Sequence, residues 1–272
     1  MLFRSTGGTL VEKCCHYFNL MDLILGEKPL RVFASGGQRV NHLDERYGDR
    51  TPDILDSAYV IVEYGSGARA MLELCMYAEN SVDSEHLTIV GDEGKIESLL
   101  PSLTLRYGRR ADWGRREVWG QPSGTGRGVS VRRVWDTNIR YPGQHFGASY
   151  IEHLRFAEAV REGKPAEIPL EEGLRAVATG LAAHRSIDEG RPVALSEIRD
   201  RLVFVSGGSS GIGAELVRAF AAQGSRVAFC GTREDGGAAL IDEIVAAGHP
   251  RPWYAACDVR DAVAYQAQLR RA

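Results

Sequence analysis

A glycine-rich turn at residues 206–213, Ser-Gly-Gly-Ser-Ser-Gly-Ile-Gly, constrains this chain more than any other feature. The apolar run 202–205 precedes the turn, and apolar residues at helical spacing follow it. These are Ile212, Leu216, Val217 and Phe220. A strand, a tight turn and a helix in this order let backbone N–H groups and a helix N-terminus hold a pyrophosphate. The sequence therefore predicts that a dinucleotide-binding fold begins near residue 200.

Strands and helices alternate in the rest of this C-terminal part. We expect strands at 202–206, 226–230 and 253–257, and helices that end near Ala222 and Ala247. Nearly continuous apolar strands with short connections favour a parallel sheet. We therefore predict a partial Rossmann unit of βαβαβ type. The boundary falls near residue 199, which gives domains 1–198 and 199–272.

A different pattern fills residues 1–198. A helix is expected within 7–26, with an apolar face of Tyr17, Leu20, Met21, Ile24 and Leu25. Strand-like runs follow at 30–35, 58–64, 68–77, 85–90, 95–99 and 104–107, with glycine-containing hairpin turns at 65–67 and 91–94. Helices return at 149–163 and 170–190. The prediction is an α+β domain with a large, mostly antiparallel open sheet, so the whole chain falls in the α/β class.

Charge and composition exclude several classes of protein. The net charge of −3 argues against a generic nucleic-acid or membrane-surface protein, because those carry a basic excess. No apolar run approaches the roughly 20 residues that span a bilayer, and the N-terminus lacks a signal pattern. The five cysteines form no C-x-x-C pair, so we expect reduced thiols, no metal site and a cytoplasmic location.

Residues 108–144 are rich in glycine and arginine, with Trp113, Trp119 and Trp135 interleaved. This composition is compatible with a nucleic-acid surface or with a solvated loop at an active site or oligomer contact. The acidic charge of the whole chain favours the solvated loop. No nucleic-acid partner is expected.

Glu12 and His16 are the candidate catalytic pair. If their segment is helical, residues four apart share a face, where a carboxylate can orient an imidazole that accepts or gives a proton. The same spacing also fits a surface or capping pair and metal ligation.

Residues 7–23 resemble the catalytic segment of the glucose-fructose oxidoreductase and inositol dehydrogenase family (Gfo/Idh/MocA). The resemblance extends over residues 6–195, through the segments 40–45, 58–63, 70–76, 90–97 and 150–154. It implies a domain that receives a sugar or polyol substrate and that often forms a homo-oligomer through the face of its sheet. It also implies that His16, assisted by Glu12, takes the proton of the hydroxyl being oxidised while hydride passes to a nicotinamide.

The chain departs from that family's pattern at two positions of this segment. Glu12 stands where an aspartate is common, and Asn19 stands where an aspartate often follows the histidine. His42 and His145 are secondary candidates on loops, with an ordinary hydrogen-bonded histidine as the simpler interpretation. Lys28 has the letters of the family's Glu-Lys-Pro motif but follows the helix in a turn, so we expect a surface residue.

The turn at 206–213 resembles the T-G-x-x-x-G-x-G turn of short-chain dehydrogenases/reductases, with Ser206 in place of threonine. Its glycines let the backbone turn sharply and approach a phosphate closely, although a tight turn without a ligand is the alternative. The resemblance implies cofactor contacts along the turn and, after the third strand, at the adenine. These residues are Ser206, Gly207, Ser209, Ser210, Gly211, Ile212, Gly213, Asp258 and Val259.

The end of the second strand indicates which cofactor is bound. Residues 230–233, Cys-Gly-Thr-Arg, offer no carboxylate to a ribose 2′-hydroxyl, whereas Arg233 can pair with a 2′-phosphate. We therefore expect NADP in preference to NAD. Because only half of a doubly wound sheet is present, the affinity is expected to be weak.

The expected function is that of an NAD(P)-dependent oxidoreductase present as a truncated or chimeric chain. Short-chain dehydrogenases use a serine and a Tyr-x-x-x-Lys pair, but no lysine follows Lys164. The cofactor domain that precedes the catalytic segment in the first family is also not expected here, so we predict no turnover by this chain alone. The alternative is a non-catalytic nucleotide-binding or oligomerisation module, or a fragment of two adjacent genes.

Overall fold

The computed structural model describes residues 8–46, 48, 51–112, 129–143, 145–198 and 202–271. The chain folds into two compact units, one made of residues 1–77 with 168–272 and the other of residues 78–167. The boundary expected near residue 199 falls outside the described residues. No helix of the described part is long and apolar enough to cross a membrane.

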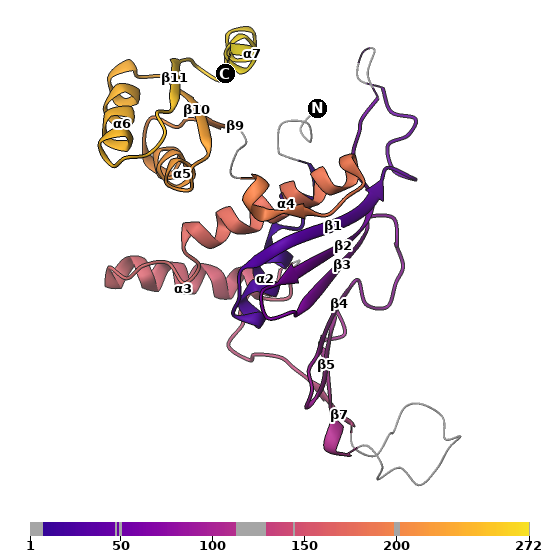
Figure 1. The fold of residues 1–272 in the computed structure, drawn as a ribbon. Helices are drawn as coiled ribbons and strands as arrows, with labels where there is room; N and C mark the ends of the chain where they lie inside the picture. Colours follow the sequence, from indigo (N-terminus) through magenta and orange to yellow (C-terminus); the bar gives the residue numbers. More distant parts are fainter. Residues whose placement is uncertain are drawn as a thin grey trace. The chain divides into compact units, whose positions relative to one another are not determined.

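An antiparallel sheet covered by helices forms the first part of the larger unit (Figure 1). The strands lie in the order β3-β2-β1-β8. The elements are α1 (Thr9–Glu12), α2 (Cys15–Leu25), β1 (Pro29–Gly37), β2 (Ser57–Tyr64), β3 (Arg69–Cys75), α4 (Leu170–Glu189), β8 (Val193–Ala194) and the 3-10 helix η3 (Leu195–Ile198). The glycine turn at 65–67 joins β2 to β3 as predicted, with the Gly67 N–H donating to the Tyr64 carbonyl at 3.1 Å.

Alternate residues of these strands point into one core. Val32, Val60 and Val62 are fully buried, and Phe18 of α2 packs against them. The opposite face of the sheet remains exposed at Phe33, Ile61 and Met71 among others. The helices α2 and α4 therefore cover a single face of the sheet.

The predicted helix within residues 7–26 is broken into α1 and α2 at Lys13 and Cys14. Phe18, which the expected apolar face omitted, is buried, whereas Ile24 of that face is exposed. The buried residues Leu10, Cys14 and Phe18 instead follow one another at a spacing of four. Tyr17, Met21 and Leu25 of the predicted face do pack against this core, so the prediction is wrong for Ile24 and misses Phe18.

A second antiparallel sheet, in the order β4-β5-β6-β7, belongs to the smaller unit. Its elements are β4 (Glu85–Val90), β5 (Gly94–Leu100), β6 (Thr104–Arg109), the 3-10 helix η2 (Arg110–Asp112) and β7 (Val129–Arg133), and the unit also contains α3 (Ala148–Glu162). The antiparallel strands are thus divided between two four-stranded sheets. The prediction of a loop at 108–144 was wrong for residues 129–133, which form the strand β7 and pair with β6. Trp135 is exposed, while Trp113 and Trp119 lie outside the described residues.

A parallel three-stranded sheet in the order β11-β10-β9 confirms the partial Rossmann unit. Its elements are β9 (Leu202–Ser206), α5 (Gly211–Ala222), β10 (Arg226–Gly231), α6 (Glu234–Ala246), β11 (Trp253–Ala256) and α7 (Ala262–Arg271). Phe229 and Val217 are fully buried at its centre. The helix α7 was not predicted. None of its residues is buried, so it needs no apolar face, and its sequence lacks the apolar periodicity from which a helix is predicted.

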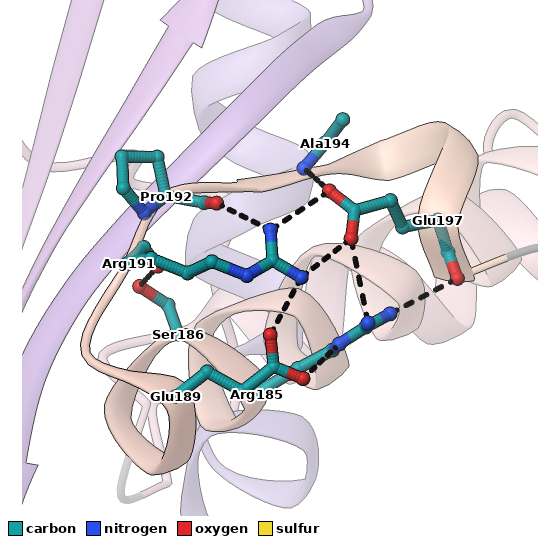
Figure 2. Close-up of polar contacts among 7 residues, drawn as sticks. All are labelled: Arg185, Ser186, Glu189, Arg191, Pro192, Ala194 and Glu197. Atoms are coloured by element: carbon teal, nitrogen blue, oxygen red, sulfur yellow. Dashed lines mark hydrogen bonds and ion pairs between the residues drawn. The ribbon is translucent and has the colours of Figure 1, made fainter.

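A network of ion pairs fixes the end of α4 against β8 and η3 (Figure 2). The Arg191 guanidinium donates to both oxygens of Glu197, at 3.2 and 2.7 Å, and contacts Glu189 Oε2 at 2.6 Å. Arg185 joins Glu189 to the same Glu197 carboxylate. Glu197 Oε1 also accepts the Ala194 N–H at 2.9 Å. The Glu197 carboxylate of η3 therefore contacts both Arg191, just after α4, and Ala194 of β8. The Arg191 hydrogen bond lowers the pKa of Glu197 from its ordinary value of 4.5 to about 2.

Replacing Glu197 by glutamine is expected to lower the midpoint of thermal unfolding at neutral pH. Because the pKa of this carboxyl is depressed in the folded chain, its stabilising effect is present above pH 4.5 and is lost as the pH falls through about 2. High salt should also reduce the difference between variant and wild type. Thermal unfolding at several pH values and salt concentrations measures both effects.

Glu152→Gln, an exposed position on α3, is the matched control and should leave the midpoint unchanged. Equal midpoints for Glu197→Gln and the wild type at pH 7 and low salt would show that the network contributes nothing to stability.

Candidate functional site

The glycine turn between β9 and α5 has the conformation that its sequence predicts. Ser206 ends β9, and Gly207 follows with φ of 68°, in the left-handed region that favours glycine. Gly211 begins α5 with φ of 55°. The chain thus reverses from strand to helix within four residues.

Two further glycines are required by close approach. A Cβ at Gly213 would lie 2.7 Å from the carbonyl carbon of Gly207 and closer still to its oxygen. A Cβ at Gly208 would lie 2.7 Å from Phe229 Cβ, and the Gly208 N–H donates to the Cys230 carbonyl at 2.8 Å. The turn is therefore packed between α5 and β10 with no room for side chains at these positions.

The N-terminus of α5 opens onto a cavity of about 460 Å³. Ser209, Ser210 and Gly211 line one side of the cavity, and Gly236 and Leu240 of α6 line another. Ser210 is the N-cap residue, and its side chain makes no cap hydrogen bond within the described chain. The first N–H groups of a helix attract an anion, so this end of the cavity is suited to a phosphate.

Arg218, which lines the cavity, and Arg233, which does not, have different surroundings. Arg218 bonds both oxygens of Glu243, at 2.8 and 2.9 Å, and also pairs with Glu215. This end of the cavity therefore already holds two carboxylates for one guanidinium and does not attract a further anion. Arg233 is the exposed N-cap residue of α6, and among the described residues its guanidinium makes no ion pair.

The residues expected at the adenine lie after β11. Asp258 is half-buried, and its two oxygens each lie 3.0 Å from Arg260 Nε. This hydrogen bond lowers the pKa of Asp258 to about 2, so the carboxylate is charged at neutral pH. Val259 is half exposed, and Ile212 is 80% exposed at the start of α5. Both apolar side chains thus face solvent in the part of the chain that the structure describes.

In the larger unit, Glu12 ends α1 and His16 lies in the first turn of α2. The helix break separates them, so the expected single helical face is replaced by two short helices. Both side chains are exposed, away from the buried row of Leu10, Cys14 and Phe18. The His16 ring lies against Tyr17, with centroids 4.1 Å apart. An exposed imidazole is accessible to a substrate, as the proton-transfer role expected for His16 requires.

His184 on α4 holds the start of this segment and was missed by sequence reasoning. Its Nε2 accepts the Leu10 N–H at 3.3 Å, so this nitrogen carries no proton. A Cβ at Gly8 would lie 2.6 Å from the same atom, and Gly8 has φ of 88°. Burial lowers the pKa of His184 below 6.5, against an opposing effect of Asp188. No local signal could identify His184, because Leu10, whose N–H it accepts, is 174 residues away in sequence.

A buried polar cluster lies farther along α2. Asp22 is buried, accepts the Tyr64 hydroxyl at 2.9 Å and lies 3.9 Å from Arg175. Burial raises the pKa of Asp22, and the Tyr64 and Arg175 contacts oppose that rise. Asn19 donates to Glu172 at 3.2 Å. Asn19 is therefore turned to α4, and the cluster fixes α2 against that helix.

The secondary candidates lie outside these groups. His42 has φ of 61°, and its Nδ1 lies 2.6 Å from Glu45 Oε1. The loop before it is held by the buried Asp56, whose carboxylate accepts three backbone N–H groups. Burial would raise the pKa of Asp56, but these N–H donors outweigh it and lower the pKa. His145 belongs to the smaller unit and is exposed. Lys28 is exposed in the turn before β1, as predicted.

Two known families match this chain, one in each of its two parts. Residues 4–195 match the model of the oxidoreductase family, C-terminal alpha/beta domain, of Gfo/Idh/MocA type. Residues 201–272 match the short chain dehydrogenase model.

Individual relatives agree with both matches. A myo-inositol 2-dehydrogenase of Thermotoga maritima is 26% identical over 198 residues, which are 72% of this chain and 51% of that protein. A probable galactose dehydrogenase of Rhizobium meliloti is 44% identical over 71 residues, which are 26% of this chain and 28% of that protein. Among solved structures, an oxidoreductase domain protein from Kribbella flavida has a TM-score of 0.51 at 17% identity. The match covers 69% of this chain and 51% of the Kribbella protein. The chain thus spans about half the length, or less, of these relatives.

The His184 contact predicts a dependence of stability on pH. In His184→Phe the ring still fills the space near Gly8, but the buried Leu10 N–H loses its acceptor, at a cost of about 1–3 kcal/mol. Because the folded pKa lies below 6.5, the unfolded chain binds more protons at this residue, so the contribution of His184 to stability is fully present above pH 6.5 and decreases as the pH falls towards the folded pKa. Urea unfolding between pH 5 and 8 should show this slope in the wild type and a smaller one in the variant.

His145→Phe, at an exposed position, is the control and should retain the wild-type slope. An equal slope in His184→Phe and the wild type would show that His184 titrates alike in the folded and unfolded chain.

Proposed function

Because this chain belongs to the oxidoreductase family whose C-terminal alpha/beta domain matches residues 4–195, we propose that it acts in the nicotinamide-dependent oxidation or reduction of a sugar or polyol. The names of its relatives, a myo-inositol 2-dehydrogenase and a probable galactose dehydrogenase, support this class of substrate. In this proposal residues 1–198 receive the substrate and residues 199–272 bind the cofactor.

The glycine turn is the observation that carries the proposal. Gly207 and Gly211 adopt left-handed conformations, and Gly213 has no room for a Cβ beside the Gly207 carbonyl. These features bring the backbone close to the α5 N-terminus, where a pyrophosphate fits. A nicotinamide bound there would accept or supply hydride.

Arg233 makes NADP the preferred cofactor in this proposal. It stands at the N-terminus of α6, directly after the end of β10, and its guanidinium makes no ion pair among the described residues. A guanidinium pairs well with a 2′-phosphate, and the strand end has no carboxylate for a 2′-hydroxyl. Ser209 and Ser210 add hydroxyl and backbone donors on the turn.

His16 is the proposed proton-transfer residue of the first domain. Its exposed imidazole can take the proton of a substrate hydroxyl, and Glu12 is proposed to assist it. The carboxylate would stabilise the imidazolium that forms. The Leu10–His184 contact and the Asp22 cluster hold the two helices that carry these residues.

A nucleotide-binding module without turnover is the second candidate, favoured by one observation. The cavity at the glycine turn is lined by residues between Ser209 and Glu243, so a nucleotide can bind there without His16. Assays of nicotinamide reduction with a panel of polyols and sugars distinguish the two candidates. Turnover that is abolished in His16→Ala supports the enzyme, whereas cofactor binding without turnover supports the module.

Titration calorimetry with NADP and NAD tests the cofactor site. We expect the wild type to prefer NADP, and Arg233→Ala to lose about tenfold in NADP affinity, as for the loss of one charge-assisted contact. The NAD affinity of this variant should change little. Arg251→Ala, at another exposed arginine before β11, is the matched control. A preference for NADP that persists in Arg233→Ala would remove Arg233 from the proposal.

We also infer that the chain associates with a second copy through the outer face of β1, β2 and β3. Phe33, Ile61 and Met71 lie in register across this face and are 42, 38 and 62% exposed. The paired Arg31 and Glu63 flank the row on one side, and Tyr59 bonded to Glu73 flanks it on the other. An apolar row with a polar border is typical of an interface.

Ile61→Lys is expected to weaken this association, because a charge would be buried without a partner. Sedimentation velocity should show an oligomer for the wild type and a shift towards monomer for the variant. Val82→Lys, in the smaller unit at a position 86% exposed, should sediment like the wild type. A monomeric wild type, or an Ile61→Lys variant that associates normally, would contradict the inference.

A further inference from the structure

Gly231 lies at the end of the second parallel strand, where dinucleotide-binding folds place a side chain that contacts the cofactor ribose. It is the last residue of β10, and it lies at the carboxyl end of the parallel sheet beside the glycine turn. In dinucleotide-binding folds a carboxylate about 20 residues after the turn binds the ribose 2′-hydroxyl. Gly231 follows the last glycine of the turn, Gly213, at about this interval.

The backbone does not require glycine at 231. Gly231 is absent from the residues with positive φ, so its conformation is open to other amino acids. The constraint is space. A Cβ at this position would lie 2.7 Å from the Ser209 Cβ, closer still to the Ser209 Oγ, and 3.4 Å from the Ser209 N. The Ser209 side chain thus lies on the face of Gly231.

Ser209 has little freedom to move away. Its neighbour Gly208 is bonded to the Cys230 carbonyl at 2.8 Å and packs against Phe229. On the other side, a Cβ at Gly236 would lie 3.3 Å from the Ser209 carbonyl oxygen, so α6 is also close. The turn is thus held between β10 and α6.

We propose that Ser209 and Gly231 form a steric pair that determines cofactor choice, because Ser209 excludes any carboxylate at the end of β10. This inference rests on the cofactor site proposed above and adds Ser209 as a residue that determines specificity. Arg233 attracts the 2′-phosphate of NADP, and the steric pair prevents a competing acceptor for the 2′-hydroxyl of NAD. Changing Gly231 alone should therefore not create an NAD site.

Four variants of the full chain test the pair: Gly231→Asp, Ser209→Gly, the double variant Ser209→Gly/Gly231→Asp, and the control double variant Ser210→Gly/Gly231→Asp. Calorimetric titration with NADP and NAD is the first measurement. We expect Gly231→Asp to lose NADP affinity without gaining NAD affinity. Ser209→Gly/Gly231→Asp should bind NAD at least about tenfold more tightly than Gly231→Asp does, as expected for one recovered charge-assisted contact. The Ser210 control should not recover it.

Thermal unfolding is the second measurement and does not depend on a cofactor. For this measurement two alanine variants are added: Gly231→Ala should lower the unfolding midpoint, and the double variant Ser209→Gly/Gly231→Ala should restore it, so the two effects are not additive. Additive shifts would show that the two residues do not interfere, which overturns the inference. NAD binding by Gly231→Asp as tight as by the Ser209 double variant would also overturn it. If the wild type binds neither cofactor, the proposed function fails and the specificity role fails with it, whatever the unfolding data show.

Discussion

The close approach of α4 to the segment that carries His16 is the constraint on which the sheet of β3, β2, β1 and β8 and its helices depend. A Cβ at Gly180 would lie 2.8 Å from the Leu10 carbonyl oxygen and 3.1 Å from the Val11 Cα, so helix and segment meet backbone to backbone. One turn farther along α4, His184 receives the Leu10 N–H. Any side chain at 180 would push α1 from α4 and carry Glu12 with it. The geometry of the candidate catalytic pair is therefore set by a glycine that takes no part in chemistry.

The sequence predicted the glycine turn in detail because its requirements are local. Gly207 and Gly211 need left-handed conformations, and the flanking strand and helix each have their own apolar period. The strand at 129–133 was missed for the opposite reason. Its valines alternate with polar residues among many glycines and arginines, and only pairing with β6 makes it a strand.

The surroundings of the catalytic segment could not be predicted in the same way. Leu10, Cys14 and Phe18 are buried by elements distant in sequence, and this burial accompanies a helix broken at Lys13 and Cys14. The pairing of Asp22 with Tyr64 joins residues 42 positions apart. A single sequence shows that such residues are polar, but it does not show which polar groups meet when the sheet and helices pack.

Ser186 gives one of these long-range contacts an observable consequence. Its hydroxyl accepts the Ala34 N–H of β1 at 2.9 Å and donates to the Arg191 carbonyl at 2.6 Å. Ser186 therefore links strand β1 to the end of α4, where Arg191 pairs with Glu189 and Glu197. The Ala34 amide can exchange its hydrogen with solvent only when this link opens. Its exchange rate is therefore a site-specific measure of how often the end of α4 detaches from the sheet.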